Sequence, residues 1–423
     1  MATTRWLGKA AATYHVVTVV VGGTVEVGDL FTLTINGKTL SYAATSTSTS
    51  TTASAIVTAW NALSASIYPE FARITASVNS SSVILTADDA GIPFSVTAAT
   101  TESNGGAADG QTFVATTTTT CTGPWHWNDA NNWSGGAVPV NGDTVYIQGS
   151  STPIRYGLDQ SAVTLTALYI EADYTGSIGL PSINTSSSAS YPEYRDTYLA
   201  IGATTLRVGA GDGTGSGLIR INTGSVQTAL SVQKTGSTQE TGTPSLWWKG
   251  THASNTGIVT RGSVGIAYRG TESATITNLK VGYETGEQTD ASVVVGSGTT
   301  LTTFTMQGGS VILSAAATTI TKNGGTLTTL GTGAYTTINH WKGTLNYRSS
   351  GTITTLNCGS ALVDFRGDMR AKTVTNCDLY DGAQIQDPQG VVTWTNGLDL
   401  NASSIPKVTL NLGTNIRVTP VAL

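Results

Sequence analysis

A short repeat in the second half of the chain constrains the fold more than any other feature of the sequence. Four copies begin at Thr302, Thr318, Thr336 and Thr354, at offsets of 16, 18 and 18 residues, and a fifth, degenerate copy starts near Thr373. The four are TTFTMQGGSVIL, TTITKNGGTLTT, TTINHWKGTLNY and TTLNCGSALVDF. A unit this short cannot enclose a core by itself, so it must bury its apolar side chains against neighbouring copies. The repeat therefore predicts a β-solenoid.

Two apolar positions recur in every copy and are expected to point into the solenoid. Successive coils stack about 4.8 Å apart, so these side chains would form continuous interior ladders. The ladder residues are Phe304, Ile320, Ile338 and Leu356 at the first position and Val311, Leu327, Leu345 and Leu362 at the second. The period also fits a left-handed helix of three hexapeptides, but the strict six-residue spacing of aliphatic residues is missing. A right-handed parallel β-helix is therefore preferred.

The composition agrees with a mainly β chain. Charged residues make up 11% of the 423 residues, against about 25% in ordinary soluble domains. Long soluble helices need charged outer faces, whereas Thr- and Val-rich strands joined by Gly turns do not. The net charge of −5 offers no basic surface for phosphates, so nucleic acid is not expected as a partner. Three cysteines without C-x-x-C spacing indicate neither a disulfide framework nor a metal site.

The segment 15–98 is predicted to be a separate α+β module. Two alternating stretches in HVVTVVVGGTVEVGDLFTLTING indicate strands, and Asn36-Gly37 indicates a hairpin turn. Two further strands, in ARITASVN and SSVILTADDAGIPFSVTAA, complete a small antiparallel sheet. Between them lies one amphipathic helix that ends at Pro69 and covers the sheet. Its apolar face consists of Ile56, Trp60, Leu63 and Ile67.

This module resembles a small domain that recurs in bacteriophage tail-sheath and other virion structural proteins. The similarity lies in fold-determining positions, namely Gly22-Gly23, Gly28-Asp29, Asn36-Gly37 and an LTA strand followed by Gly91, and it covers roughly a fifth of the chain. In that family the domain is an add-on or an assembly surface. The resemblance therefore implies attachment to a particle and carries no catalytic residue.

The rest of the chain divides into a linker, the solenoid and two terminal segments. Residues 99–122, rich in Thr, Gly and Ala, are expected to be a linker or extended arm. The solenoid is predicted over 123–400, with an N-terminal arm at 1–14 and a strand-like tail at 401–423. Its first residues, GPWHWNDANNWSGGAVPVNGDTVYI, resemble the entry to parallel β-helices in bacterial surface and passenger proteins. Trp125, Trp127 and Trp133 are expected to cap the solenoid, because an open end leaves apolar strand ends bare.

Few residues are candidates for chemistry. His340 lies at the fifth position of its repeat, where the other copies have Met306, Lys322 and Cys358, and this variation predicts an outward position. Asp364, Arg366 and Asp368 alternate along VDFRGDMRAK with Arg370 and Lys372, so all five are expected on one face. The two carboxylates could serve glycoside hydrolysis, as in β-helix polysaccharide lyases and hydrolases, or they could pair with their basic neighbours. Pairing is the favoured interpretation, and no residue is assigned as catalytic.

Two aromatic segments and one glycine run complete the candidates. The segments YPEYRDTY, Tyr191–Tyr198, and SLWWKG, Ser245–Gly250, would stack on sugar rings if exposed or form an interface core if buried between subunits. The interface is the favoured interpretation. The run Gly209–Gly217 lacks the Lys-Ser/Thr pair and the following helix of a phosphate loop, so no cofactor is expected.

The chain is therefore expected to be a non-enzymatic structural protein of a phage or prophage virion. The opening residues contain neither an apolar run of membrane-spanning length nor a secretory signal, which indicates synthesis in the host cytoplasm and no membrane partner. The expected role is capsid decoration or spike protein, or tail fibre, with the arm and module binding other capsid or tail proteins. A homotrimer is expected by analogy with other phage β-helix proteins, and a host surface glycan is a further candidate partner. The alternatives are a bacterial surface adhesin or passenger-like protein and, less favoured, a polysaccharide-degrading β-helix enzyme.

Overall fold

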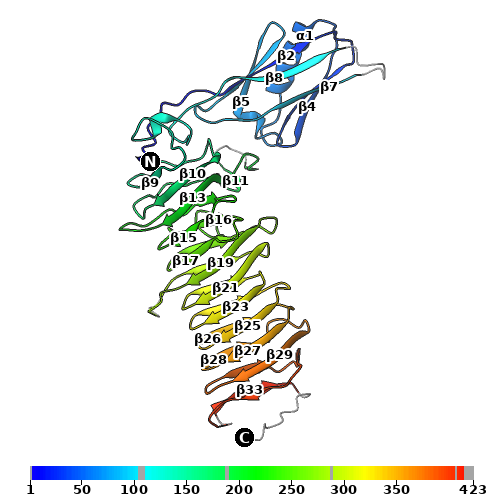
Figure 1. Ribbon diagram of the computed structural model, residues 1–423. Coiled ribbons are helices and arrows are strands. Elements are labelled where there is room, and N and C mark those ends of the chain that lie inside the picture. Colours follow the sequence, from blue (N-terminus) through cyan, green and yellow to red (C-terminus); the bar gives the residue numbers. More distant parts are fainter. Residues whose placement is uncertain (1, 103–109, 186–189, 286–288, 405–406, 414–423) are drawn as a thin grey trace.

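The computed structural model describes residues 2–102, 110–185, 190–285, 289–404 and 407–413. The chain is mainly β, with a small N-terminal module followed by a long stack of parallel strands (Figure 1). This confirms the predicted fold class of a module followed by a β-solenoid. The module and the solenoid each have their own hydrophobic core. Within the described ranges, no helix is long and apolar enough to cross a membrane.

Two ladders of parallel strands run along the solenoid. From β15 onward, each strand pairs with the strand one coil further on rather than with its neighbour in the chain, as β21 does with β23 and β22 with β24. The first ladder comprises β9 (Thr144–Ile147), β10 (Asp159–Ile170), β13 (Leu199–Val208), β15 (Ala229–Val232), β17 (Thr256–Val259), β19 (Ala274–Val281), β21 (Thr299–Met306), β23 (Ala317–Lys322), β25 (Tyr335–His340), β27 (Ile353–Cys358), β29 (Lys372–Leu379), β31 (Val392–Trp394) and β32 (Asp399–Leu400). The second comprises β14 (Ile219–Asn222), β16 (Leu246–Lys249), β18 (Ser263–Ile266), β20 (Ser292–Val295), β22 (Ser310–Leu313), β24 (Thr326–Thr329), β26 (Gly343–Tyr347), β28 (Ala361–Asp364), β30 (Gln384–Asp387) and β33 (Thr409–Leu412).

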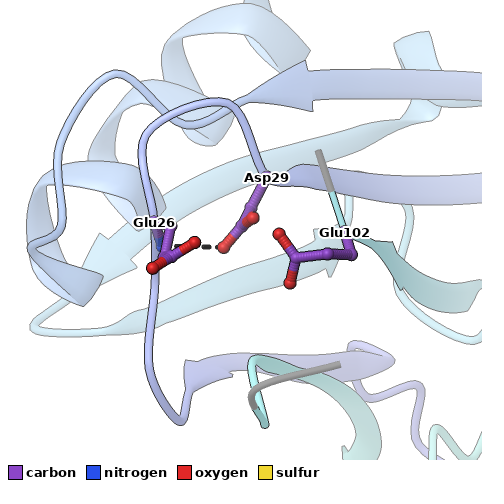
Figure 2. A group of neighbouring side chains, drawn as sticks. All are labelled: Glu26, Asp29 and Glu102. Atoms are coloured by element: carbon purple, nitrogen blue, oxygen red, sulfur yellow. Dashed lines mark hydrogen bonds between the residues drawn. The ribbon is translucent and has the colours of Figure 1, made fainter. Parts of the chain in front are cut away.

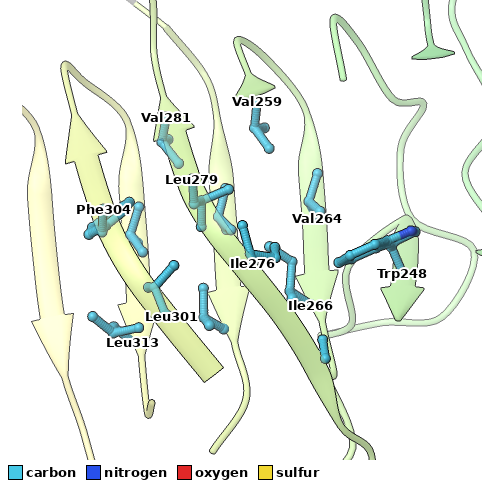
Figure 3. Close-up of a cluster of buried hydrophobic side chains, with 14 of the residues drawn as sticks. Trp248, Val259, Val264, Ile266, Ile276, Leu279, Val281, Leu301, Phe304 and Leu313 are labelled. Carbon is cyan, nitrogen blue, oxygen red and sulfur yellow. The ribbon is translucent and has the colours of Figure 1, made fainter. Parts of the chain in front are cut away.

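Side chains on the inner faces of the ladders pack against those of the coils above and below. Figure 3 shows this for the coils around β16 to β22, where aliphatic and aromatic side chains fill the interior. The first predicted ladder is in register throughout: Phe304 lies opposite Ile320, Ile320 opposite Ile338, and Ile338 opposite Leu356. All four are fully buried.

The second predicted ladder is right for Val311, Leu327 and Leu345 and wrong for Leu362. Leu345 pairs with Val363, which is fully buried, whereas Leu362 pairs with Thr344 and is only half-buried. Because side chains alternate along a strand, an alignment error of one residue exchanges the inner and outer faces. The last copy lacks the glycine that marks the bend in the other three, and Ala361 occupies that position.

The first residues of the chain belong to the solenoid and do not form the separate N-terminal arm predicted at 1–14. β1 (Thr3–Arg5) pairs in parallel with β9, and Trp6 packs edge-on against Trp133 with ring centroids 5.1 Å apart. Trp133 in turn contacts Trp127 and donates its Nε1 hydrogen to the Trp127 carbonyl at 2.7 Å. These three indoles are buried at the N-terminal end of the solenoid core, while Trp125 is only partly buried beside them.

The module consists of two antiparallel sheets and one helix. One sheet has the order β5 (Ile74–Asn79), β6 (Ser82–Ala87), β2 (Val16–Gly22), β8 (Thr112–Thr119); the other has the order β4 (Lys38–Ala43), β3 (Leu30–Ile35), β7 (Thr97–Thr101). The helix α1 (Thr49–Asn61) begins at Ser48, whose side chain accepts a hydrogen bond from the Thr51 backbone. A 3₁₀ turn, η1 (Phe71–Arg73), leads into β5.

The predicted helix is too long at its C-terminal end. Ile56 and Trp60 are buried, and Trp60 donates its Nε1 hydrogen to the Ile74 carbonyl at 2.9 Å. The helix ends at Asn61, however, so Leu63 is only partly buried and Ile67 is 62% exposed. The apolar spacing continues beyond Asn61, but Ser64 and Ser66 in the following stretch favour a turn, since serine hydroxyls compete for backbone hydrogen bonds.

The predicted linker at 99–122 is also wrong, because most of its described residues belong to the module. β7 reaches Thr101 and pairs with β3, and β8 pairs with β2 in the other sheet. These segments are largely Thr and Ala, and most β8 side chains are solvent-exposed. Their sequence therefore shows no apolar alternation, although the β-branched threonines favour strand conformation.

Candidate functional site

The most unusual chemical feature of the solenoid is a column of polar side chains in its interior. Lys322 lies opposite His340 in the ladder, and His340 lies opposite Cys358. All three are fully buried, as is Met306 in the preceding coil. The predicted outward position of His340 is therefore wrong. Residues three and five of each copy are two apart on one strand, so they must share the inner face.

Lys322 Nζ and His340 Nε2 are paired with backbone carbonyls, whereas His340 Nδ1 is buried and has no hydrogen-bond partner among the described residues. Lys322 donates from Nζ to the Gly325 carbonyl at 2.7 Å and to the Lys342 carbonyl at 2.9 Å, and the Nε2 hydrogen of His340 is donated to the Leu362 carbonyl at 3.0 Å. Burial lowers the pKa of Lys322 to about 7. Burial, with the nearby Lys322 charge, lowers the pKa of His340 to about 4, so this imidazole is neutral at pH 7. The column is thus enclosed among core side chains and shielded from solvent.

The charged segment 364–372 is a set of local ion pairs. Asp364 pairs with Arg366 at 3.0 Å, and Asp368 pairs with Arg370 at 2.7 Å. Hydrogen bonds from these arginines lower the pKa of both carboxyls, most strongly for Asp368. Lys372 is buried, donates to the Asp368 and Arg370 carbonyls and lies 3.5 Å from Asp368 Oδ2, so it does not share one face with the exposed Arg366 and Arg370 as predicted. A general acid for glycoside hydrolysis needs a raised pKa, and here the arginines have the opposite effect.

The two aromatic segments meet beside a polar groove of about 800 Å³ on the solenoid. Tyr198 lies 6.4 Å from Trp247, and cations cover both rings: Lys249 lies over Tyr198, and Arg220 lies over Trp247 at 4.0 Å. The rings are almost fully buried within one chain. They therefore provide neither an open platform for a sugar ring nor the core of an interface between subunits. The charged groove walls, with acidic and basic groups intermixed, are the accessible part.

A second groove follows one corner of the coils around the repeats, with a volume of about 910 Å³. Its floor is built from the glycine pairs of successive copies, and Gln307, Asn323 and Trp341 line it at equivalent positions. The Trp341 ring is 37% exposed and packs against Tyr380 with centroids 5.6 Å apart. Within the repeat TTINHWKGTLNY, Trp341 and Lys342 are thus exposed at this corner, whereas His340 is enclosed.

Buried polar contacts join the module to the solenoid. His126, 4% exposed, donates from Nε2 to the Gly91 carbonyl of the module at 2.9 Å. Arg195 donates to the Pro93 carbonyl at 2.9 Å and is held by Glu193 in an ion pair at 2.7 Å whose side chains are largely buried. Arg195 follows β12 (Tyr191–Pro192), which pairs with β11 (Ile183–Asn184) in an excursion from the solenoid. The junction is therefore a packed contact between distant chain segments.

No protein-family model, curated protein or solved structure matches the chain. The functional argument therefore depends on the architecture and on the side chains described above.

Two features escape sequence analysis. The inward direction of Lys322 and His340 follows from strand alternation, which the variability of that position obscures. The second feature is a group of three carboxylates in the module, from Glu26, Asp29 and Glu102. Glu26 and Asp29 are close in sequence, but only strand pairing brings Glu102 beside them.

Proposed function

We propose that this protein is a non-enzymatic structural component displayed on a bacteriophage particle, as a capsid decoration or spike protein or as a tail fibre. The observation that carries the proposal is the packed junction at His126 and Arg195. Because buried contacts join the module to the N-terminal end of the solenoid, a particle that holds the module would also fix the direction of the rod (Figure 1).

The two parts suit two different tasks. The resemblance of the module to the small domain of phage tail-sheath proteins supports particle attachment through this end. The solenoid is a stack in which each coil contacts mainly its neighbours, an architecture that extends in one dimension and presents long surfaces. The proposal includes a homotrimer and binding of a host surface glycan. The charged groove or the Trp341 groove would provide the surface for these contacts.

The chemistry of the two acids in the segment 364–372 supports a non-enzymatic role. Asp364 and Asp368 were the strongest candidates for glycosidase carboxylates, and each is neutralised by an arginine two residues away. Purified protein should therefore leave bacterial polysaccharides intact in a reducing-end assay. Depolymerisation by the wild-type protein that is lost in the Asp364→Asn, Asp368→Asn double variant would replace the structural proposal with the enzymatic one.

The direct test is quantitative mass spectrometry of purified particles from the phage or induced prophage that carries the gene. Hundreds of copies per particle would indicate capsid decoration or a sheath, and a few copies would indicate a fibre or spike. Absence from intact particles, with the protein found instead on the bacterial surface, would refute the proposal in favour of an adhesin. Light scattering of the purified chain tests the trimer separately.

A further inference from the structure

Three carboxylates converge at one edge of the module. Glu26 and Asp29 lie in the segment between β2 and β3, and Glu102 directly follows β7 (Figure 2). β3 and β7 pair antiparallel with Leu30 opposite Thr101, so Asp29 and Glu102 are the next residues outward on the two strands. In Figure 2 the Asp29 carboxylate lies between the other two, and all three point toward one another.

The spacing of these groups matches the coordination sphere of a hard cation. One carboxylate oxygen from each residue lies within 4.8 Å of the other two. Calcium binds oxygen ligands at about 2.3–2.6 Å, so two oxygens on the same ion can be up to about 5 Å apart. A single ion can therefore contact all three carboxylates without a large rearrangement. Glu102 is also oriented by Gln111, whose Nε2 donates to Glu102 Oε2 at 3.3 Å.

Asp29 provides the second, independent indication. Its side chain is fully buried, and its Oδ2 accepts a hydrogen bond from the Glu26 backbone at 2.7 Å. Its Oδ1 is buried and has no hydrogen-bond partner among the described residues. A carboxyl oxygen in this position loses its hydration without replacement, which is costly for a folded protein. A cation between the three carboxylates would provide the missing partner.

We propose that Glu26, Asp29 and Glu102 form a divalent-cation site that binds calcium. The three ligands are all oxygens, which favours a hard ion over zinc or copper. Calcium fits better than magnesium because Glu26 lies on an exposed loop, and calcium tolerates irregular geometry with water completing six to eight ligands. The ion would tie the β2–β3 loop to the end of β7. The site does not depend on the proposed phage role.

The test is isothermal titration of the EDTA-treated full-length chain with CaCl₂, together with thermal unfolding with and without calcium. We expect one ion per chain, with a Kd between about 10⁻⁵ and 10⁻³ M, and a higher unfolding temperature in calcium. Glu26→Gln and Glu102→Gln should each weaken binding about tenfold or more and reduce the calcium-dependent shift. The matched control is Asp212→Asn, an exposed acid on the solenoid, which should bind calcium as the wild type does.

Asp29→Asn removes the buried ligand but can also destabilise the module. The decisive variant is therefore Glu26→Gln, because Glu26 is exposed and its substitution should leave the fold intact. Absence of saturable binding up to about 10 mM calcium would overturn the site. Equal calcium affinity of the wild type and the Glu26→Gln, Glu102→Gln double variant would also overturn it. Magnesium binding as tight as calcium binding would overturn the choice of ion.

Discussion

The buried His340 predicts a specific dependence of stability on acid pH. In the folded chain its pKa is about 4, against 6.5 for an unperturbed histidine. Between these values the unfolded chain takes up a proton that the folded chain does not. The free energy of unfolding therefore falls as the pH drops through the window from 6.5 to 4, and this contribution is constant below it.

The size of the effect follows from the two pKa values. Their difference corresponds to at most about 3.4 kcal/mol, of which about 2 kcal/mol should be lost between pH 7 and pH 5. For a chain of this length that loss lowers the unfolding temperature by about 2 °C. His340→Met removes the titrating group and places in this coil the side chain that Met306 already provides two coils earlier in the same ladder.

The assay is calorimetric or fluorescence-monitored unfolding of the wild type and His340→Met from pH 4 to pH 7.5. Other groups, including His15 and His126, also contribute to the wild-type curve, because burial lowers their pKa as well. They cancel when the two curves are subtracted, and the difference should change by about 2 kcal/mol between pH 7 and pH 5. His252→Gln is the control and should follow the wild type. If the free energies of unfolding of the wild type and His340→Met differ by the same amount at every pH, the buried, uncharged state of His340 is refuted.

Three further predictions concern the packing of the solenoid and are all measured by thermal or chemical unfolding. Val363→Ala should cost about 2 kcal/mol and Leu362→Ala less than about 1 kcal/mol, and the reverse order would contradict the observed register. Gly343→Ala should lower the free energy of unfolding by about 2–5 kcal/mol, because Gly343 has a φ of +85° and the new Cβ would lie 2.3 Å from the Gly325 carbonyl oxygen. Gly224→Ala is the control: its Cβ would enter open space, and the substitution should cost about 1 kcal/mol. Trp133→Ala should cost about 3–5 kcal/mol by removing the centre of the indole cluster, and an unchanged midpoint would show that the cluster does not stabilise this end.

The solenoid was predictable because its signal is local and repeated. Apolar residues recur at fixed offsets, so Ile320, Ile338 and Leu356 could be assigned to the core from spacing alone. The same logic failed at Leu362, where the copy lacks the glycine that anchors the alignment. It also failed for Ile67, because apolar spacing does not report where helix propensity ends.

The polar features were harder to predict because they depend on contacts between distant segments. Variation at the fifth repeat position suggested solvent exposure, yet Lys322 and His340 are tolerated inside because carbonyls at the coil corners accept their hydrogens. Most threonines of β8 face solvent, so their pattern contains no core signal even though the strand completes the sheet.

The sequence by itself determined that the chain stacks short β coils behind a small N-terminal module, since period and composition are properties of neighbouring residues. Only the tertiary structure decided which residues from distant segments meet: Trp6 with Trp133, His126 with Gly91, and Asp29 with Glu102. The physical reason is that strand pairing joins residues far apart in the chain through backbone hydrogen bonds, which every residue except proline can make. The amino-acid pattern therefore specifies which side chains are buried more strongly than it specifies their partners.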